Sequence, residues 1–207
     1  MSTSSTKSLS NYQHARRAVL FVLLLVVFGA LLFISSYPEQ SDFHEFAEAF
    51  GVSLIGIAIL GRLWCTLYIG GRKSAVIVSD GPYSIVRNPL YVFSAIGAAG
   101  VGAQTGSAVV SLVFGMATML VFTIVARREE AFLRDKFGAA FEAYCARVPR
   151  MLPKFSLYRD SASIVVIPKR LYTTFFDSLI FFVALPVFGL VESLQLHGFL
   201  PVLLRLP

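Results

Sequence analysis

Charged side chains are scarce in this sequence. Only 14% of its 207 residues are Asp, Glu, Lys or Arg, whereas about a quarter of the residues of a soluble globular domain are charged. Apolar residues make up 56% of the chain, and the mean hydropathy is +0.72. This balance excludes an ordinary soluble enzyme and predicts an integral membrane protein that forms one compact bundle.

Cysteine and histidine are also rare, which argues against two kinds of site. The two cysteines, Cys65 and Cys145, are too few for a disulfide framework. The three histidines, His14, His44 and His197, lie far apart in the sequence and indicate no metal-ligand cluster. We therefore expect no bound metal.

Apolar segments, in contrast, are long. The first of them, residues 18–36, could also be a cleaved signal peptide. However, its apolar part is longer than that of a typical signal peptide, and residues 35–38 make a poor cleavage site. The sequence predicts an all-α fold, a polytopic transmembrane helix bundle. Its expected spans, about five in number, are residues 18–36, 46–69, 90–103, 107–126 and 171–191.

Lysine and arginine are distributed unevenly between the loops. Of the 18, three lie in residues 1–17, three in residues 70–88 and ten in residues 127–170, whereas the loops at 37–45 and 104–106 have none. By the positive-inside rule, the three basic segments face the cytoplasm. Membrane topology thus accounts for the net charge of +6, and we expect no nucleic-acid partner.

Two of the segments carry further local signals. Residues 90–103 are short and rich in Gly, Ala and Ser, so this helix should pack closely against its neighbours. Residues 127–155 place apolar side chains at spacings of three and four, which predicts an amphipathic helix, divided at Gly138 and ended by Pro149. The expected organisation is a flexible cytosolic arm (1–17), a four-helix membrane core (18–126) containing the connector 70–89, the amphipathic segment (127–155) and an additional membrane helix (171–191).

The stretch Gly81–Tyr91, with the sequence Gly-Pro-Tyr-Ser-Ile-Val-Arg-Asn-Pro-Leu-Tyr, concentrates polar and aromatic groups at a helix entrance. A short β-like apolar run, residues 75–78, precedes it. Arg87 is either an anchor for lipid phosphate or a fork that holds an anionic substrate group. Tyr83 and Tyr91 either belong to an interfacial aromatic belt or line a pocket.

Other charged residues fall in or beside the spans. Glu129 and Glu130 directly follow an apolar segment. Glu130 either pairs with Arg134 on a solvated helix face, or the two carboxylates bind ligand hydroxyls or an amine. Asp177 in the last span is either functional or at the headgroup level. Arg62 is long enough to reach the membrane interface from the second span.

Both polar segments resemble motifs of one enzyme family. Gly81–Tyr91 is similar to the G-x-Y-x-x-x-R-H-P-x-Y signature of the isoprenylcysteine carboxyl methyltransferase family and its phospholipid methyltransferase relatives. Residues 129–153 resemble the second block of that family, E-E-x-x-L-x-x-x-F-G-x-x-Y-x-x-Y-x-x-x-V-P-R-x-x-P, with Phe141 in place of the first tyrosine. The two motifs have the expected order and spacing, and the resemblance covers residues 50–155.

The resemblance implies a membrane-embedded methyltransferase that uses S-adenosyl-L-methionine, bound at the cytosolic face between the two motifs. Two positions depart from the family: Asn88 replaces the usual histidine, and Ala75 replaces a second one, so contact there would be through the backbone. Carried over by position, the cofactor contacts would be Ala75, Val76, Ile77, Val78, Tyr83, Asn88, Pro89, Leu90, Tyr91, Glu129 and Glu130.

The acceptor should be oriented by an arginine. A carboxylate nucleophile is ionised at neutral pH and needs no general base, and Arg87 is the candidate that orients it. The family's substrate arginine falls at Val125 in this chain, so Arg127 or Arg128 would have to substitute; the predicted catalytic residues are Arg87 and Arg127.

The expected substrate is the carboxylate or thiol of an isoprenoid or other lipidic molecule, taken from the bilayer. Three alternatives stay open. The pattern Asn-Pro-x-Tyr, which begins at Asn88 in this chain, also occurs in the phospholipid branch of the family and favours N-methylation of a phospholipid amine. Membrane sterol-type reductases share a loosely similar pattern and would bind NADPH. A scaffold or transporter is the non-enzymatic alternative, although corresponding Gly/Pro-interrupted spans are not seen.

Overall fold

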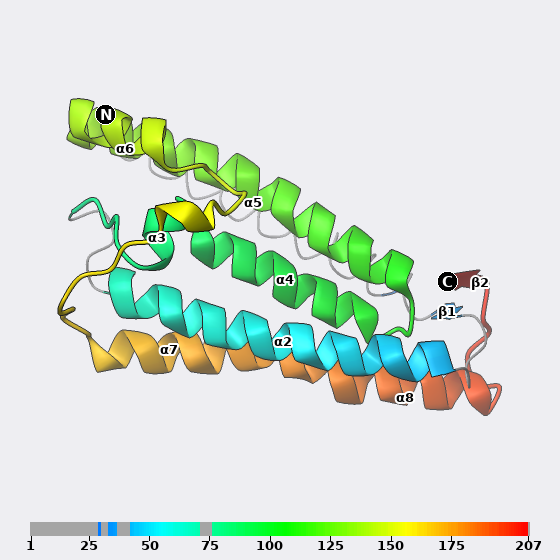
Figure 1. Ribbon diagram of the computed structural model, residues 1–207. Helices are drawn as coiled ribbons and strands as arrows, with labels where there is room; N and C mark the ends of the chain where they lie inside the picture. The colour runs from blue at the N-terminus through cyan, green and yellow to red at the C-terminus, as the bar shows by residue number, and fades with distance from the viewer. Residues whose placement is uncertain (1–28, 30–32, 37–41, 71–75, 207) are drawn as a thin grey trace, which may run out of the picture.

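The computed structural model of this chain describes residue 29 and residues 33–36, 42–70 and 76–206. These residues are mostly helical, as Figure 1 shows, with two short strands at one end. In chain order the elements are β1 (Ile34–Ser36), α2 (Asp42–Ile69), α3 (Pro82–Ile85), α4 (Pro89–Ala103), α5 (Ala108–Phe137), α6 (Ala139–Arg147), the 3-10 helix η1 (Phe155–Leu157), α7 (Pro168–Ser178), the 3-10 helix η2 (Leu179–Val183), α8 (Ala184–Leu196) and β2 (Leu204–Leu206).

Helix α4 is the centre of the bundle. It packs between α2 and α5, while α7 and α8 run along the far side of α2 (Figure 1). The small residues of α4 allow this close approach, because a Cβ on Gly100 would lie 2.7 Å from the carbonyl oxygen of Gly51 on α2. The close packing that residues 90–103 predict is therefore present.

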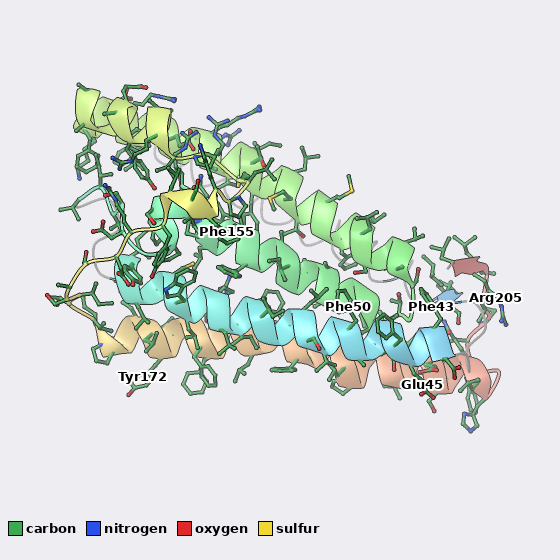
Figure 2. All side chains as sticks on the ribbon, in the orientation of Figure 1. Phe43, Glu45, Phe50, Phe155, Tyr172 and Arg205 are labelled. Carbon is green, nitrogen blue, oxygen red and sulfur yellow. The ribbon has the colours of Figure 1, made fainter. Side chains whose placement is uncertain are left out.

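The outer surface of the bundle is apolar. Helix α5 has only three buried side chains, Val110, Ala126 and Glu130, and exposes leucine, valine and methionine along its first five turns. Figure 2 shows Tyr172 pointing away from the bundle, and Phe43, Phe50 and Tyr172 are all exposed. An apolar surface of this extent requires a nonaqueous environment, so the chain is an integral membrane protein.

Three helical segments of the described chain are long and apolar enough to cross a membrane: Asp42–Ile69, Ala108–Phe137 and Pro168–Leu196. They correspond to the second, fourth and fifth predicted spans. The third predicted span, residues 90–103, corresponds to the shorter apolar helix Pro89–Ala103. The first predicted span, 18–36, and the arm, 1–17, lie almost entirely outside the described residues.

Several predicted boundaries differ from the structure. Helix α2 begins at Asp42 rather than at residue 46. Helix α5 continues without a break through residue 126, because Arg, Glu, Ala and Leu in its last turns are strong helix formers. It ends at Gly138, which has a φ of 53°, and α6 ends just before Val148 and Pro149, as predicted. Residues 76–79 form no strand.

Arg62 does not extend to a membrane interface. Its Nε donates to Ser178 Oγ at 2.8 Å and its Nη1 donates to Ser94 Oγ, while its guanidinium lies 5.8 Å from the Phe181 ring centroid. These contacts join α2 to α4, α7 and η2. Asp177 is exposed on α7, so the buried polar contact of that helix is made by the next residue, Ser178.

The two strands bring distant parts of the chain together. β1 and β2 are parallel, with Ile34 opposite Leu204 and Ser36 opposite Leu206. They lie at the end of the bundle where α2 begins and α8 ends, opposite to α3 (Figure 1). The C-terminal segment therefore lies at the same end as the start of α2.

Candidate functional site

A cavity of about 400 Å³ lies at the α3 end of the bundle, within the size range of small-molecule sites. It is bordered by the connector that follows α2, by the start of α4, by the last turns of α5 and by α6. Its lining residues are Ile69, Val76, Ile77, Val78, Tyr83, Arg87, Asn88, Leu90, Tyr91, Arg128, Glu129, Glu130, Phe132, Leu133, Phe141 and Tyr144.

The glycine and prolines of the stretch Gly81–Tyr91 give the backbone its course. Gly81 has a φ of 56°, and a Cβ at this position would overlap the Tyr68 ring. Only glycine adopts this conformation without strain and also leaves room for the ring. Pro82 and Pro89 occupy the first turns of α3 and α4, where proline is favoured. The intervening residues are thereby directed towards the cavity.

The second motif is hydrogen-bonded directly to the first. The Arg87 N–H donates to the Pro149 carbonyl at 2.8 Å, and the Lys154 N–H donates to the Ile85 carbonyl at 2.9 Å. The Tyr144 hydroxyl, on α6, donates to the Tyr83 carbonyl at 2.8 Å. Two segments more than 50 residues apart therefore form one structural unit.

Glu130 is the electrostatic centre of this unit, with 2% of its surface exposed. Arg150 binds its carboxylate through both Nε, at 3.0 Å from Oε1, and Nη2, at 2.8 Å from Oε2. Arg87 Nη1 lies 3.0 Å from Oε2, and Asn88 Nδ2 donates to Oε1 at 3.4 Å. The hydrogen bond to Glu130 raises the pKa of the Arg150 guanidinium. One carboxylate thus neutralises only one of two guanidinium groups, and the cluster keeps one positive charge.

Two alternatives left open by the sequence are decided by these contacts. Glu130 does not pair with Arg134, whose Nε is instead 2.6 Å from Glu142 Oε1. Arg87 is not an anchor on the outer surface, since its side chain is 12% exposed and lines the cavity. Its Nη1 also donates to Cys145 Sγ at 2.9 Å, and its buried Nε has no hydrogen-bond partner among the described residues.

Glu129 faces the same cavity but is held differently from its neighbour. The Tyr91 hydroxyl donates to Glu129 Oε2 at 2.9 Å. The Tyr91 ring stacks on Phe122 of α5 with the centroids 4.5 Å apart and the planes 7° apart. This contact fixes the phenol, and the phenol orients a half-buried carboxylate towards the cavity.

The opposite wall is formed by backbone and by aromatic rings. Residues 76–78 are irregular, and no backbone hydrogen bond joins them to any other described residue. Val76, Ile77 and Val78 all line the cavity, so their N–H and C=O groups lie beside it. Burial raises the pKa of the Tyr83 and Tyr144 phenols well above their usual value, so both stay neutral. No histidine is among the described residues that line this cavity.

Most of the predicted site residues meet in this cavity. Pro89 is buried at the start of α4 without lining it, and Ala75 lies outside the described residues. Arg127 is exposed and is not a lining residue, whereas Arg128 is one. The sequence analysis missed Arg150, although the V-P-R segment of the second motif contains it. The predicted residues that line the cavity are Val76, Ile77, Val78, Tyr83, Arg87, Asn88, Leu90, Tyr91, Glu129 and Glu130.

Comparison with known proteins gives one family match and three informative relatives. The profile of the family described as phospholipid methyltransferase matches residues 17–140. The cobalt-zinc-cadmium resistance protein CzcN of Cupriavidus metallidurans is 35% identical over 92% of this chain and 87% of its own length. The nickel-cobalt-cadmium resistance protein NccN of Alcaligenes xylosoxydans xylosoxydans is 35% identical over 90% of this chain and 87% of its own.

The third relative covers less of the chain. A protein-S-isoprenylcysteine O-methyltransferase of Schizosaccharomyces pombe is 36% identical over 82 residues, which are 40% of this chain and 35% of that protein. No solved structure matches the chain.

Proposed function

This chain belongs to the phospholipid methyltransferase family, and from that premise we propose that it uses S-adenosyl-L-methionine to methylate a lipidic acceptor within the membrane. The acceptor group is a carboxylate, or a thiol, of an isoprenoid or other lipid. The observation that carries this proposal is the union of the two motifs around one cavity with an excess of positive charge.

The chemistry of the cavity fits S-adenosyl-L-methionine. The backbone groups of residues 76–78, which no backbone hydrogen bond joins to another described residue, suit the polar edge of an adenine ring. The carboxylate of Glu129, oriented by Tyr91, suits ribose hydroxyls or the amino group of the methionine part. The neutral rings of Tyr83 and Tyr144 provide aromatic surface beside a sulfonium cation. These residues would hold the cofactor, which supplies a methyl group already activated for transfer.

The protein then has to position the acceptor and exclude water. Arg87 lines the cavity and brings guanidinium N–H groups to it, and the positive charge left over by Glu130 favours an anionic group electrostatically. No histidine is available as a proton acceptor among the described lining residues. A carboxylate needs none, whereas an ammonium group must lose a proton before it can attack. We therefore place carboxylate methylation ahead of amine methylation.

Asn88 does not change that order. Its Nδ2 donates to Glu130 Oε1 at 3.4 Å and to the Arg150 carbonyl at 3.2 Å. The amide thus joins the two motifs to each other. Its role here is explained by these contacts without a phospholipid amine.

An acceptor with a lipid tail has a direct route to the cavity. Phe132 lines the cavity and is 57% exposed on the outer surface of α5. In a bilayer, an apolar chain could lie against this surface while its polar end enters the cavity. By the positive-inside rule, the basic residues of 127–170 favour a cytoplasmic position for the same end of the bundle, where the water-soluble cofactor would be available.

Binding measurements on purified protein test the proposal. The protein, in nanodiscs, is titrated with S-adenosylhomocysteine and, separately, with NADPH; we expect binding of the first alone. Transfer of a labelled methyl group is then followed to a prenylated cysteine with a free carboxylate, to a prenyl thiol and to phosphatidylethanolamine. Absence of S-adenosylhomocysteine binding would overturn the proposal, and NADPH binding would favour a reductase.

A second proposal concerns the cellular role. The two relatives that match over nine tenths of the chain are described as resistance proteins for cobalt, zinc, nickel or cadmium. We propose that the methyl transfer contributes to resistance to such divalent ions. A host lacking the gene should grow less well in zinc, cobalt or cadmium, and an Arg87→Lys variant should fail to restore growth. Equal growth of both strains in all three metals would contradict this role.

A further inference from the structure

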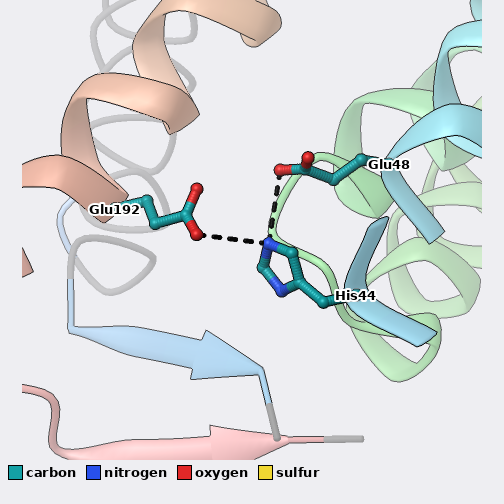
Figure 3. Close-up of side chains that lie close together, drawn as sticks. All are labelled: His44, Glu48 and Glu192. Atoms are coloured by element: carbon teal, nitrogen blue, oxygen red, sulfur yellow. Dashed lines mark ion pairs between the residues drawn. The ribbon is translucent and has the colours of Figure 1, made fainter. Parts of the chain in front are cut away.

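A second cluster of titratable side chains lies at the end of the bundle opposite to the cavity. It consists of His44 and Glu48 from α2 and Glu192 from α8, shown in Figure 3. His44 is 6% exposed, and the side chains of the two glutamates are about one-third exposed. The cluster is therefore enclosed on the imidazole side and open to solvent on the carboxylate side.

The distances in this cluster differ from those of ordinary hydrogen bonds. His44 Nε2 lies 3.4 Å from Glu48 Oε1 and 3.5 Å from Glu192 Oε1. An N–H···O hydrogen bond normally spans about 2.7–3.2 Å. Two ligand atoms about 2.0–2.1 Å from a tetrahedral metal ion are separated by roughly 3.3–3.4 Å. The two separations from His44 Nε2 match the spacing of ligands around a small metal ion.

The fold brings the three ligand atoms close together. His44 and Glu48 are four residues apart on one helix and so lie on the same face. Glu192 lies on α8, 144 positions after Glu48 in the chain. All three ligand atoms lie within 4.8 Å of one another. In the turn after α4, Gly106 has a φ of 70°, and a Cβ there would overlap His44 Nδ1. Glycine at this turn thus leaves the space that the imidazole occupies.

We propose that His44, Glu48 and Glu192 form a binding site for one divalent transition-metal ion, of the class represented by Zn²⁺ and Co²⁺. One imidazole nitrogen and two carboxylate oxygens are ligands that these ions accept. The two carboxylates balance the charge of the ion. Three protein ligands leave at least one position for water or another molecule. Three ligands are too few for Ca²⁺, which takes six to eight oxygen atoms.

This site is separate from methyl transfer. It uses no residue of the cavity and lies at the other end of the molecule (Figure 1). The family profile ends at residue 140 and does not include α8. Glu192 lies on this helix, so the proposed site gives α8 a role. Metal binding at this site would connect α8 to the start of α2 and so stabilise one end of the bundle.

The test uses the full chain without a polyhistidine tag, titrated with Co²⁺ in the absence of cofactor. Visible absorption reports on the coordination of Co²⁺, and displacement by Zn²⁺ gives the Zn²⁺ affinity. We expect one Co²⁺ per chain, loss of the absorption band in His44→Ala, and at least about a tenfold weaker affinity in Glu48→Gln and Glu192→Gln. His197→Ala is the matched control, because His197 is exposed near the same end and its Nδ1 lies 2.7 Å from the Ser193 carbonyl oxygen.

Several results would overturn the proposal. They are an absence of Co²⁺ absorption in the unaltered chain, a band that persists in His44→Ala, and an equal loss in His197→Ala. Glu192→Gln changes one atom of the side chain, so a folded variant is expected, and the size of the purified particle checks this. In the folded Glu192→Gln variant, an unchanged Co²⁺ affinity would show that the cluster is only a set of ion pairs. None of these readouts depends on S-adenosyl-L-methionine binding or on activity.

Discussion

Glu129 and Glu130 are adjacent in the sequence and differ in what surrounds them. Glu130 is buried between two arginines, and Glu129 faces the cavity beside the Tyr91 hydroxyl. Breaking a buried ion pair by removing one partner typically costs about 3–5 kcal/mol, because the remaining charge is left uncompensated. Loss of a half-exposed carboxylate costs much less. The two positions should therefore respond differently to the same substitution.

We predict that Glu130→Gln lowers the free energy of unfolding by about 3 kcal/mol or more, since Arg87 and Arg150 would then lie together without a counter-charge. Glu129→Gln should leave the unfolding temperature nearly unchanged and weaken S-adenosylhomocysteine binding at least about tenfold, which is the loss of one charge-assisted hydrogen bond. Thermal unfolding and calorimetric titration of both variants measure these effects. A Glu130→Gln protein with an unchanged unfolding temperature would show that the buried ion pairs of Glu130 do not stabilise the fold.

Arg87 should act on the acceptor rather than on the cofactor. We predict that Arg87→Lys keeps the charge next to Glu130 but loses the planar fork, so that kcat/KM for the acceptor falls by about a hundredfold. The affinity for S-adenosylhomocysteine should change less than about threefold, that is, by less than the loss of one net hydrogen bond.

The matched control for this prediction is Arg127→Ala. Arg127 was predicted from the sequence to be catalytic, but its side chain is exposed and does not line the cavity. Its removal should leave kcat/KM close to that of the unaltered protein. Full loss of activity in Arg127→Ala, with Arg87→Lys active, would reverse the two roles.

At the scale of elements, the connector between α2 and α4 depends on one glycine. Gly81 combines a φ of 56° with direct contact to the Tyr68 ring, and its N–H donates to the Arg159 carbonyl at 2.9 Å. The Tyr68 hydroxyl in turn donates to Asp160 at 2.7 Å, which lowers the pKa of that carboxyl group. The start of the first motif is thus attached to both α2 and the segment that follows α6.

We predict that Gly81→Ala lowers the free energy of unfolding by about 1–2 kcal/mol from the left-handed backbone alone, with a further loss from displacement of the Tyr68 ring. S-adenosylhomocysteine binding should weaken as well, because α3 positions Tyr83. Gly189→Ala on α8 is the matched control, since a Cβ there meets nothing within 4 Å. It should unfold at the same temperature as the unaltered protein or slightly higher. Equal unfolding temperatures for the two variants would contradict the argument.

The whole molecule has two chemically distinct ends. The cavity and most of the basic residues of the described chain lie at one, and the His44 cluster and the two strands lie at the other. If the positive-inside rule holds, these ends face opposite sides of the membrane, with the cavity in the cytoplasm.

We predict that a membrane-impermeant maleimide added to intact cells labels His197→Cys and does not label Ser156→Cys. Both side chains are exposed, one after α8 and the other in η1 next to α3. Cys65 is buried, and labelling of the unaltered chain gives the background from Cys145. Labelling after permeabilisation checks that both new cysteines are reactive. Labelling of Ser156→Cys alone in intact cells would place the cavity on the outer side.

Membrane character, the approximate positions of the described membrane helices and ten of the residues that line the cavity could be predicted from the sequence. Insertion of a segment into a membrane depends on its apolar composition and its length, and both are visible in the sequence without knowledge of the fold. Most of the lining residues were predicted through the resemblance of both motifs to one enzyme family, which the order and spacing of residues along the chain make visible. Gly138 and Pro149 ended their helices as predicted, since each acts through its own backbone.

Only the tertiary structure decided which charged groups meet. The Glu130–Arg150 pair spans 20 residues, the hydrogen bond from Arg62 to Ser178 spans 116, and His44 meets Glu192 across still more of the chain. The spacing of His44 and Glu48 on one helix was a usable signal, but the third ligand was not foreseeable. Pairing of this kind depends on how helices pack, and packing is set by many weak contacts that no local pattern encodes. The sequence thus determined the membrane character of the chain and its membership of the phospholipid methyltransferase family. The packing of the helices decided which charged side chains contact one another.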